Sequence, residues 1–193
     1  MAVSPQTKTR MTAEEYKALP ETKQHVELIH GELIVHQYGD ENMPGGPKDA
    51  HQQSISLIQA FLYQLVPARE VRAANTDVYL DNENIVQPDV LWASSESGQC
   101  VRQDDGYLHG APDLVIEVLS PTTARHDRST KFNLYEKNGV REYWMMDADI
   151  QLIEVYVREG DRFTRLGGFG PGESFTSPVL GNKTVNIDAI LGQ

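Results

Sequence analysis

The chain has 193 residues, of which 39% are hydrophobic and 23% charged, and its formal net charge at pH 7 is −11. This composition predicts one globular domain with a sizeable core and excludes a disordered chain. The acidic charge argues against a protein that coats nucleic acid non-specifically, but it leaves room for a local basic site.

The N-terminal part of the sequence predicts a tail, a short helix and a hairpin. Residues 1–10 are expected to form a disordered tail. Residues 12–19 begin with a capping-box sequence, which is typical of a helix start. Residues 25–36 contain two apolar runs around a central glycine and predict a β-hairpin. The Pro/Gly sequence at residues 44–47 indicates a loop.

The middle of the sequence alternates between helical and strand patterns. Residues 49–66 predict a helix capped by its first residue, because apolar side chains recur on one face, at Ile55, Ile58, Phe61, Leu62 and Leu65. Strands are expected at residues 71–80 and 85–92, followed by a loop over residues 94–111. The almost wholly apolar residues 114–119 predict a strand that is buried on both faces.

The C-terminal part completes this pattern. Residues 127–139 have helical spacing and end in a glycine terminator. Strands at residues 142–146 and 152–157 precede a glycine-rich hairpin region near residues 158–172. Residues 184–191 are expected to add a strand and a turn of helix. The order helix, three strands, helix, strand predicts an α/β (α+β) fold with a mixed sheet flanked by helices.

Two acidic residues stand inside apolar strands. Glu117 interrupts residues 114–119, and Asp89 interrupts residues 85–92. A buried carboxylate needs a cation, a network of donors or a raised pKa. If the two strands pair in antiparallel fashion, opposing Cα atoms approach to about 5 Å, so Asp89 and Glu117 can hold one cation. Asp113 is roughly 13 Å from Glu117 at about 3.3 Å per residue, which is too far to share that ion.

Such a pair suits Mg²⁺, with Mn²⁺ as its expected substitute. Mg²⁺ binds one or two carboxylates and a backbone carbonyl, here that of Val118, and keeps several waters. A lysine beside the metal would orient a water or stabilise developing charge during phosphodiester hydrolysis. Lys131, in the helix after the Glu117 strand, is the candidate.

Two alternative interpretations of these residues stay open. Lys131 can form a surface ion pair with Asp127, four residues before it, which is the favourable order in a helix. Asp89 and Glu117 can belong to a structural network in which backbone donors satisfy the buried acids.

Several segments together resemble a known family. They are Val86-Gln87-Pro88-Asp89-Val90, residues 110–121, Lys131 with Tyr135, residues 139–144, residues 11–16, residues 27–33 and His51-Gln52. They resemble the Uma-type restriction endonuclease family, which is abundant in cyanobacteria and belongs to the PD-(D/E)xK superfamily. The resemblance covers about residues 11–158.

The resemblance implies a restriction-endonuclease-like αβββαβ core at about residues 49–158 of a single domain over residues 11–193. It also implies that Asp89 and Glu117 are the two acids of the superfamily motif. The superfamily pattern places its lysine two residues after the second acid, where this sequence has Leu119. In Uma-type sequences the lysine comes from the following helix, which matches Lys131.

Four further residues are candidates for an accessory role. Glu27 and Glu32 match family positions and could lie near the metal, although acids in hairpins are usually solvated. His51 could contact a phosphate, or it could simply be a polar residue that opens its helix. Asp127 is favoured as an N-cap or as the partner of Lys131 rather than as a metal ligand.

The leading hypothesis is a Mg²⁺-dependent endonuclease that hydrolyses phosphodiester bonds of DNA, with the metal on Asp89 and Glu117 and the attacking water assisted by Lys131. The alternative is a catalytically silent protein of the nuclease fold that acts as a binding or assembly module, which the acidic charge and Leu119 favour. Hydrolysis of another phosphate ester is a third possibility, because a fold does not determine its substrate. The superfamily resemblance implies a homodimer.

The sequence predicts a cytoplasmic protein without a membrane partner. Residues 1–10 contain no apolar signal segment, and no apolar run approaches the roughly 20 residues of a membrane span. Cys100 is the single cysteine, which excludes an intramolecular disulfide, and it is expected in a loop without a role. Tyr135, Tyr143 and Trp144 are expected to pack in the core.

Overall fold

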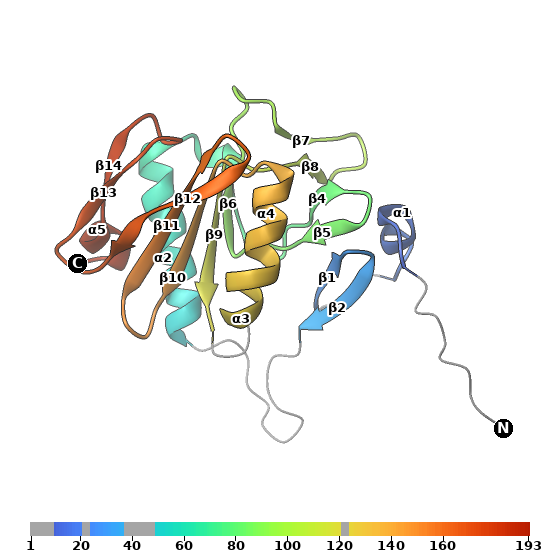
Figure 1. Ribbon diagram of the computed structural model, residues 1–193, viewed down its shortest axis with the longest axis horizontal. Coiled ribbons are helices and arrows are strands. Elements are labelled where there is room, and N and C mark those ends of the chain that lie inside the picture. Colours follow the sequence, from blue (N-terminus) through green and yellow to red (C-terminus); the bar gives the residue numbers. More distant parts are fainter. Residues whose placement is uncertain (1–9, 21–23, 37–48, 121–123) are drawn as a thin grey trace, which may run out of the picture.

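The described part of the chain contains two six-stranded mixed sheets, one two-stranded sheet and the helices around them (Figure 1). The structure is a computed structural model, and it describes residues 10–20, 24–36, 49–120 and 124–193. Nearly all of the expected tail and the whole loop at residues 44–47 lie outside these ranges. No helix within them is long and apolar enough to cross a bilayer.

The first sheet, in the strand order β12-β11-β10-β9-β6-β3, carries the core of the fold. Antiparallel pairing joins β9 to β6, and parallel pairing joins β9 to β10. The order along the chain confirms the restriction-endonuclease-like αβββαβ core. Its elements are α2 (Asp49–Leu65), β3 (Val71–Ala73), β6 (Val90–Trp92), β9 (Leu114–Leu119), the helix built from α3 (Ala124–His126), η2 (Asp127–Lys131) and α4 (Phe132–Asn138), and β10 (Glu142–Asp147).

The second sheet contains the N-terminal hairpin and two shorter hairpins. Its strands are β2 (Glu32–His36), β1 (His25–Ile29), β5 (Asn84–Val86), β4 (Val78–Asp81), β8 (Leu108–Gly110) and β7 (Cys100–Arg102), in spatial order. The predicted hairpin at residues 25–36 is therefore confirmed. Beside this sheet lies α1 (Ala13–Lys17), whose N-cap Thr12 forms the predicted capping box with Glu15.

The C-terminal elements extend and cover the first sheet. A hairpin of β11 (Leu152–Glu159) and β12 (Arg162–Phe169) forms its outer edge. A separate two-stranded sheet of β13 (Ser174–Ser177) and β14 (Lys183–Asn186) leads into α5 (Ile187–Leu191). The predicted strand and helical turn near the C-terminus are thus present, and the structure adds β13.

The prediction of two long strands is wrong, because each of these segments forms two short strands that lie in different sheets. The run at residues 71–80 divides into β3 and β4, and Asn75 between them has a φ of 66°, outside the strand region. The run at residues 85–92 divides into β5 and β6 around Pro88. Proline has no N–H to donate to a ladder, so it interrupts the pairing at this point.

The loop expected at residues 94–111 is also partly wrong. It contains the short strands β7 and β8, which pair with each other. Cys100 consequently lies in a strand and is buried, which raises the pKa of its thiol to about 12. A thiol in this state is a poor nucleophile at neutral pH.

The alternation of β9 separates two hydrophobic clusters and determines where Glu117 points. Leu114, Ile116 and Val118 pack with α2 on one face, whereas Val115 and Leu119 pack with α4 on the other. Figure 1 shows α2 and α4 on opposite faces of this sheet. Because strand side chains alternate between faces, Glu117 shares the α4 face with Val115 and Leu119.

Candidate active site

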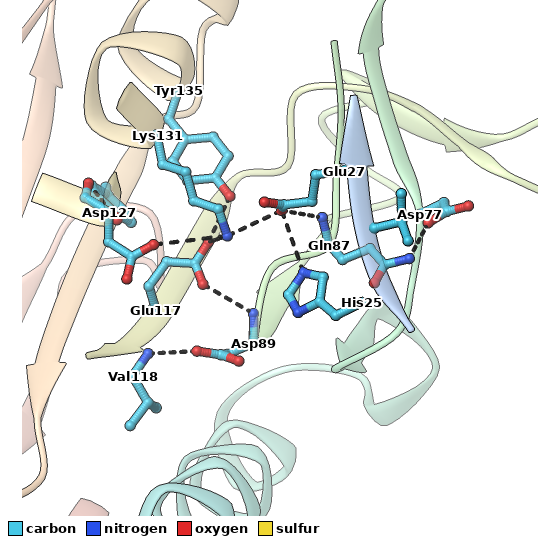
Figure 2. A network of polar contacts seen from close by, with 12 residues as sticks. His25, Glu27, Asp77, Gln87, Asp89, Glu117, Val118, Asp127, Lys131 and Tyr135 are labelled. Carbon is cyan, nitrogen blue, oxygen red and sulfur yellow. Dashed lines mark hydrogen bonds and ion pairs between the residues drawn. The ribbon is translucent and has the colours of Figure 1, made fainter. Parts of the chain in front are cut away.

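The strand pairing places the two predicted acids opposite each other. Val90 of β6 pairs with Ile116 of β9, so Asp89 is the next position across from Glu117. The Asp89 amide donates to Glu117 Oε2 at 3.3 Å, and the Val118 amide donates to Asp89 Oδ2 at 2.8 Å (Figure 2). The antiparallel arrangement expected from the sequence is therefore present, and each acid is also held by the backbone of the other strand.

Lys131 points from the helix into this pair of strands. Its side chain is 3% exposed, and Nζ lies 3.0 Å from Glu117 Oε1 and 3.1 Å from Glu27 Oε1. Asp127 Oδ1 is more distant, at 3.9 Å. The interpretation of Lys131 as half of a surface ion pair is therefore wrong, because the lysine is buried and contacts Glu117 and Glu27 more closely.

The shape of the helix brings several side chains to this point. Residues Asp127–Lys131 form a π-helical turn between α3 and α4, and both end residues of that turn are buried. Tyr135, one turn after Lys131, is fully buried and donates its hydroxyl to Glu117 Oε1 at 2.7 Å. Tyr135 packs in the core as expected, but it also holds Glu117.

Glu27 brings the second sheet to the site. Its side chain in β1 is fully buried, accepts a hydrogen bond from the Gln87 amide at 2.8 Å and lies 3.7 Å from His25 Nε2. The expectation that hairpin acids are solvated is wrong for Glu27. Glu32, by contrast, is exposed at the start of β2.

His51 extends from the first turn of α2 toward Asp89. Its Nε2 lies 3.5 Å from Asp89 Oδ2. Burial alone would lower the pKa of His51, but the hydrogen bond and charge of Asp89, together with a hydrogen bond to the Val118 backbone, raise it. His51 thus borders Asp89 and the Val118 backbone, two of the three groups predicted to hold the metal, rather than merely opening its helix.

The site contains more acidic side chains than basic ones. Four carboxylates, of Glu27, Asp89, Glu117 and Asp127, influence the single ammonium of Lys131. Burial alone would lower the pKa of Lys131, but these carboxylates raise it well above its ordinary value. Lys131 is therefore a permanent cation, suited to orienting a water or stabilising negative charge rather than to accepting a proton.

For Glu117, the partner of Lys131 in this ion pair, the effect of burial on the pKa outweighs the opposing effect of the ammonium. Burial raises the pKa of Glu117 well above its ordinary value, and the neighbouring carboxylates add to this effect against the opposing charge of Lys131. A further cation at the site would relieve the excess of negative charge.

The residues present fit a hard divalent cation. Within the described ranges, no three His, Cys, Asp or Glu side chains converge closely enough to hold a metal ion by themselves. Mg²⁺ does not need such a set, because it uses one or two carboxylates and keeps several waters. Asp89 and Glu117, as oxygen donors in a site with surplus negative charge, meet this requirement.

Asp113 lies apart from the site, as its spacing predicted. Its carboxylate accepts hydrogen bonds from Arg141 Nη1, the Ser94 amide and Ser97 Oγ, each at 2.8 Å. These contacts connect the start of β9 to the loop after β6 and to the residue before β10, which is a structural role.

Comparison with known proteins places the chain in a family. A model of the Uma2 family, described as "Putative restriction endonuclease", matches residues 13–188. The chain belongs to this family. A relative from Synechocystis sp., "Uncharacterized protein slr1290", is 29% identical over 133 residues, which cover 65% of this chain and 67% of the relative.

A solved structure supports the fold of this Uma2 member. The crystal structure of a "putative nuclease belonging to DUF820" from Anabaena variabilis superposes with a TM-score of 0.70 at 22% identity. The match covers 94% of this chain and 98% of the other. At this identity the likeness concerns the fold.

Two contacts of the Uma2 site were not predicted from the sequence. Tyr135 follows Lys131 by four residues, so helical geometry alone placed both on one face, and this signal could have been used. The contact of Gln87 with Glu27 carried no such signal, because it joins residues 60 positions apart.

Proposed function

We propose that this Uma2-family protein is a divalent-metal-dependent endonuclease that hydrolyses phosphodiester bonds of DNA. The observation that carries the proposal is the convergence of Asp89, Glu117 and Lys131 in one largely buried cluster. The family description and the fold both support a nuclease.

The residues have distinct roles in this proposal. Asp89 and Glu117, with the Val118 carbonyl, would hold Mg²⁺ or Mn²⁺. Such an ion, when bound, lowers the pKa of a coordinated water and neutralises phosphate charge. Lys131 orients the attacking water and stabilises the charge that develops on the phosphate.

The surrounding residues position this machinery. Tyr135 donates to Glu117 Oε1, whereas Glu117 Oε2 faces the Asp89 amide. Glu27 and Asp127 hold the ammonium of Lys131 from two further sides. His51, beside Asp89, is placed to contact a substrate phosphate.

The silent binding module is the alternative to this proposal. A structural network would also place Lys131 against Glu117, because a buried carboxylate needs a cation or donors, so the cleavage test below separates the two. We further propose that the protein acts in the cytoplasm as a homodimer, in which two sites would cut the two strands of a duplex.

The test is cleavage of supercoiled plasmid DNA with Mg²⁺ or Mn²⁺ by purified wild type, Asp89→Asn, Glu117→Gln and Lys131→Met. Each variant is expected to lose on the order of 10²-fold or more in rate, as when one transition-state donor is removed. Single-stranded DNA and RNA in parallel reactions define the substrate class.

Two other buried acids, one directly before β9 and one in β10, serve as matched controls. Asp113→Asn and Glu142→Gln alter carboxylates whose contacts lie outside the cluster. Both are expected to keep wild-type activity per folded molecule. Undiminished cleavage by Glu117→Gln would refute the proposed site.

Metal binding is a separate readout of the same proposal. A specific ion at 100 times its Kd should stabilise the native state by about 2.7 kcal/mol. Thermal unfolding with and without Mn²⁺ should show this gain in wild type and in Glu142→Gln, but not in Glu117→Gln.

A further inference from the structure

A small groove on the second sheet is lined by two arginines that form no ion pair with any described residue. It has a volume of about 290 Å³, and its lining includes Arg72, Asn75, Thr76, Asp77 and Arg102. The groove lies between the segment that joins β3 to β4 and the hairpin of β7 and β8. None of its lining residues belongs to the cluster around Lys131.

The charge state of these arginines sets them apart. Several other basic side chains are neutralised by carboxylates, such as Arg162 by Glu136 and Arg165 by Glu154. Among the described residues, neither Arg72 nor Arg102 has a carboxylate within 4.0 Å.

The position of Arg72 is fixed without loss of its charge. Its Nη1 donates to the backbone carbonyls of Arg69 and Val71. These carbonyls orient the guanidinium but do not cancel its positive charge. Two uncompensated guanidinium groups at one groove, in a chain of net charge −11, indicate a site for an anion.

Asp77, the acidic residue that lines the groove, is hydrogen-bonded to Gln87. Asp77 Oδ1 accepts a hydrogen bond from Gln87 Nε2 at 2.6 Å. Burial raises the pKa of Asp77, and the charge of Glu27 adds to this effect. Asp77 is thus engaged by Gln87 rather than by either arginine.

The same contact connects the groove to the candidate active site. Asp77 contacts Gln87, the Gln87 amide contacts Glu27, and Glu27 contacts Lys131 Nζ at 3.1 Å (Figure 2). Gln87 is also two residues before Asp89 in the chain. Gln87 and Glu27 thus link the groove to the cluster at which a phosphodiester is proposed to be cut.

We propose that the Arg72–Arg102 groove binds a backbone phosphate of the nucleic acid substrate on one side of the scissile bond. This inference rests on the proposed nuclease function and adds the contact that positions the substrate. The small volume suits one phosphate with its sugar, and phosphate contacts position a nucleic acid without reading its sequence.

The test compares two double variants with the same change in charge. Arg72→Gln/Arg102→Gln removes the groove cations, whereas Arg162→Gln/Arg165→Gln removes two ion-paired arginines from β12. Binding of a fluorescein-labelled duplex is measured by anisotropy in EDTA over a series of salt concentrations. Arg102→Gln alone is included because Arg102, unlike Arg72, donates to no backbone carbonyl among the described residues.

The groove variant should bind at least about tenfold more weakly, and its log–log salt slope should fall by about 0.9 for each lost phosphate contact. Arg102→Gln should show part of this loss, and the β12 control should resemble wild type. Equal binding by the groove variant and the control would overturn the proposal. A phosphate-induced stabilisation lost in the groove variant without any change in DNA binding would reveal a small-anion site and would also overturn it.

These outcomes are distinguishable from failure of the proposed function. If wild type cleaves DNA and Glu117→Gln does not, while the groove variant binds like the control, only the groove assignment fails. If wild type neither binds nor cleaves any nucleic acid, both proposals fail.

Discussion

Among the described residues, Lys131 supplies the ammonium that faces Glu27, Glu117 and Asp127, and its removal should lower both stability and activity. In Lys131→Met, Glu27, Glu117 and Asp127 lose their nearest cation. Breaking a buried ion pair by removing one partner costs about 3–5 kcal/mol. We expect a loss of this size in the free energy of unfolding, measured by urea denaturation at pH 7.

A double variant separates this electrostatic effect from lost packing. Adding Glu117→Gln to Lys131→Met removes one of the stranded carboxylates and should restore part of the stability. A double variant no more stable than Lys131→Met would show that the loss came from packing alone.

At the scale of elements, a buried carboxylate joins β10 to the C-terminal segment. Glu142 accepts hydrogen bonds from Trp144 Nε1 at 2.7 Å, Ser177 Oγ at 3.0 Å and the Val179 amide at 3.4 Å. Burial raises the pKa of Glu142 above its ordinary value of 4.5 despite these donors.

The raised pKa makes this junction sensitive to pH. Because the folded state holds the Glu142 proton more tightly than the unfolded state, its contribution is complete below pH 4.5 and is lost as the pH rises through the folded pKa. Relative to Glu142→Gln, which cannot titrate, wild type should therefore become less stable as the pH is raised from 4.5 to 7. Urea denaturation of both proteins at several pH values checks this, and parallel stability curves would contradict it.

At the scale of the whole molecule, the two sheets should unfold together. Trp92 and Trp144 both report on the first sheet, whereas far-UV circular dichroism reports on both sheets. The pair between Glu27 of β1 and Lys131 of the helix joins them. We expect the two probes to give coincident urea transitions, in line with the prediction of a single domain over residues 11–193. A separate second transition by circular dichroism would show that the second sheet is an independent unit.

Much of the core could be predicted because its elements are long and periodic. The apolar face of α2 and the run of β9 gave clear signals. The positions at which the two long strands break were harder to predict, although Pro88 indicated one of them, because proline interrupts strand pairing. The three-residue strands β7 and β8 are too short for periodicity to separate them from a loop.

The candidate site, too, could be predicted only in part. Asp89 and Glu117 were found because charged residues are conspicuous inside apolar strands, and the family resemblance indicated Lys131. The burial of Glu27 depends on how the second sheet packs against the helix, which no local pattern encodes. Its contact with Lys131 therefore became visible only in the structure.

The separation between Glu117 and Lys131 has a consequence for how such proteins are found. Lys131 Nζ lies 3.0 Å from Glu117 Oε1, although the two residues are 14 positions apart in the sequence, because the lysine belongs to a helix and not to the strand of Glu117. Leu119, at the usual lysine position, is thereby free to pack in the hydrophobic cluster beneath α4. A search that requires a lysine two residues after an acid would pass over this chain, whereas a search by spatial arrangement of the three side chains would retrieve it.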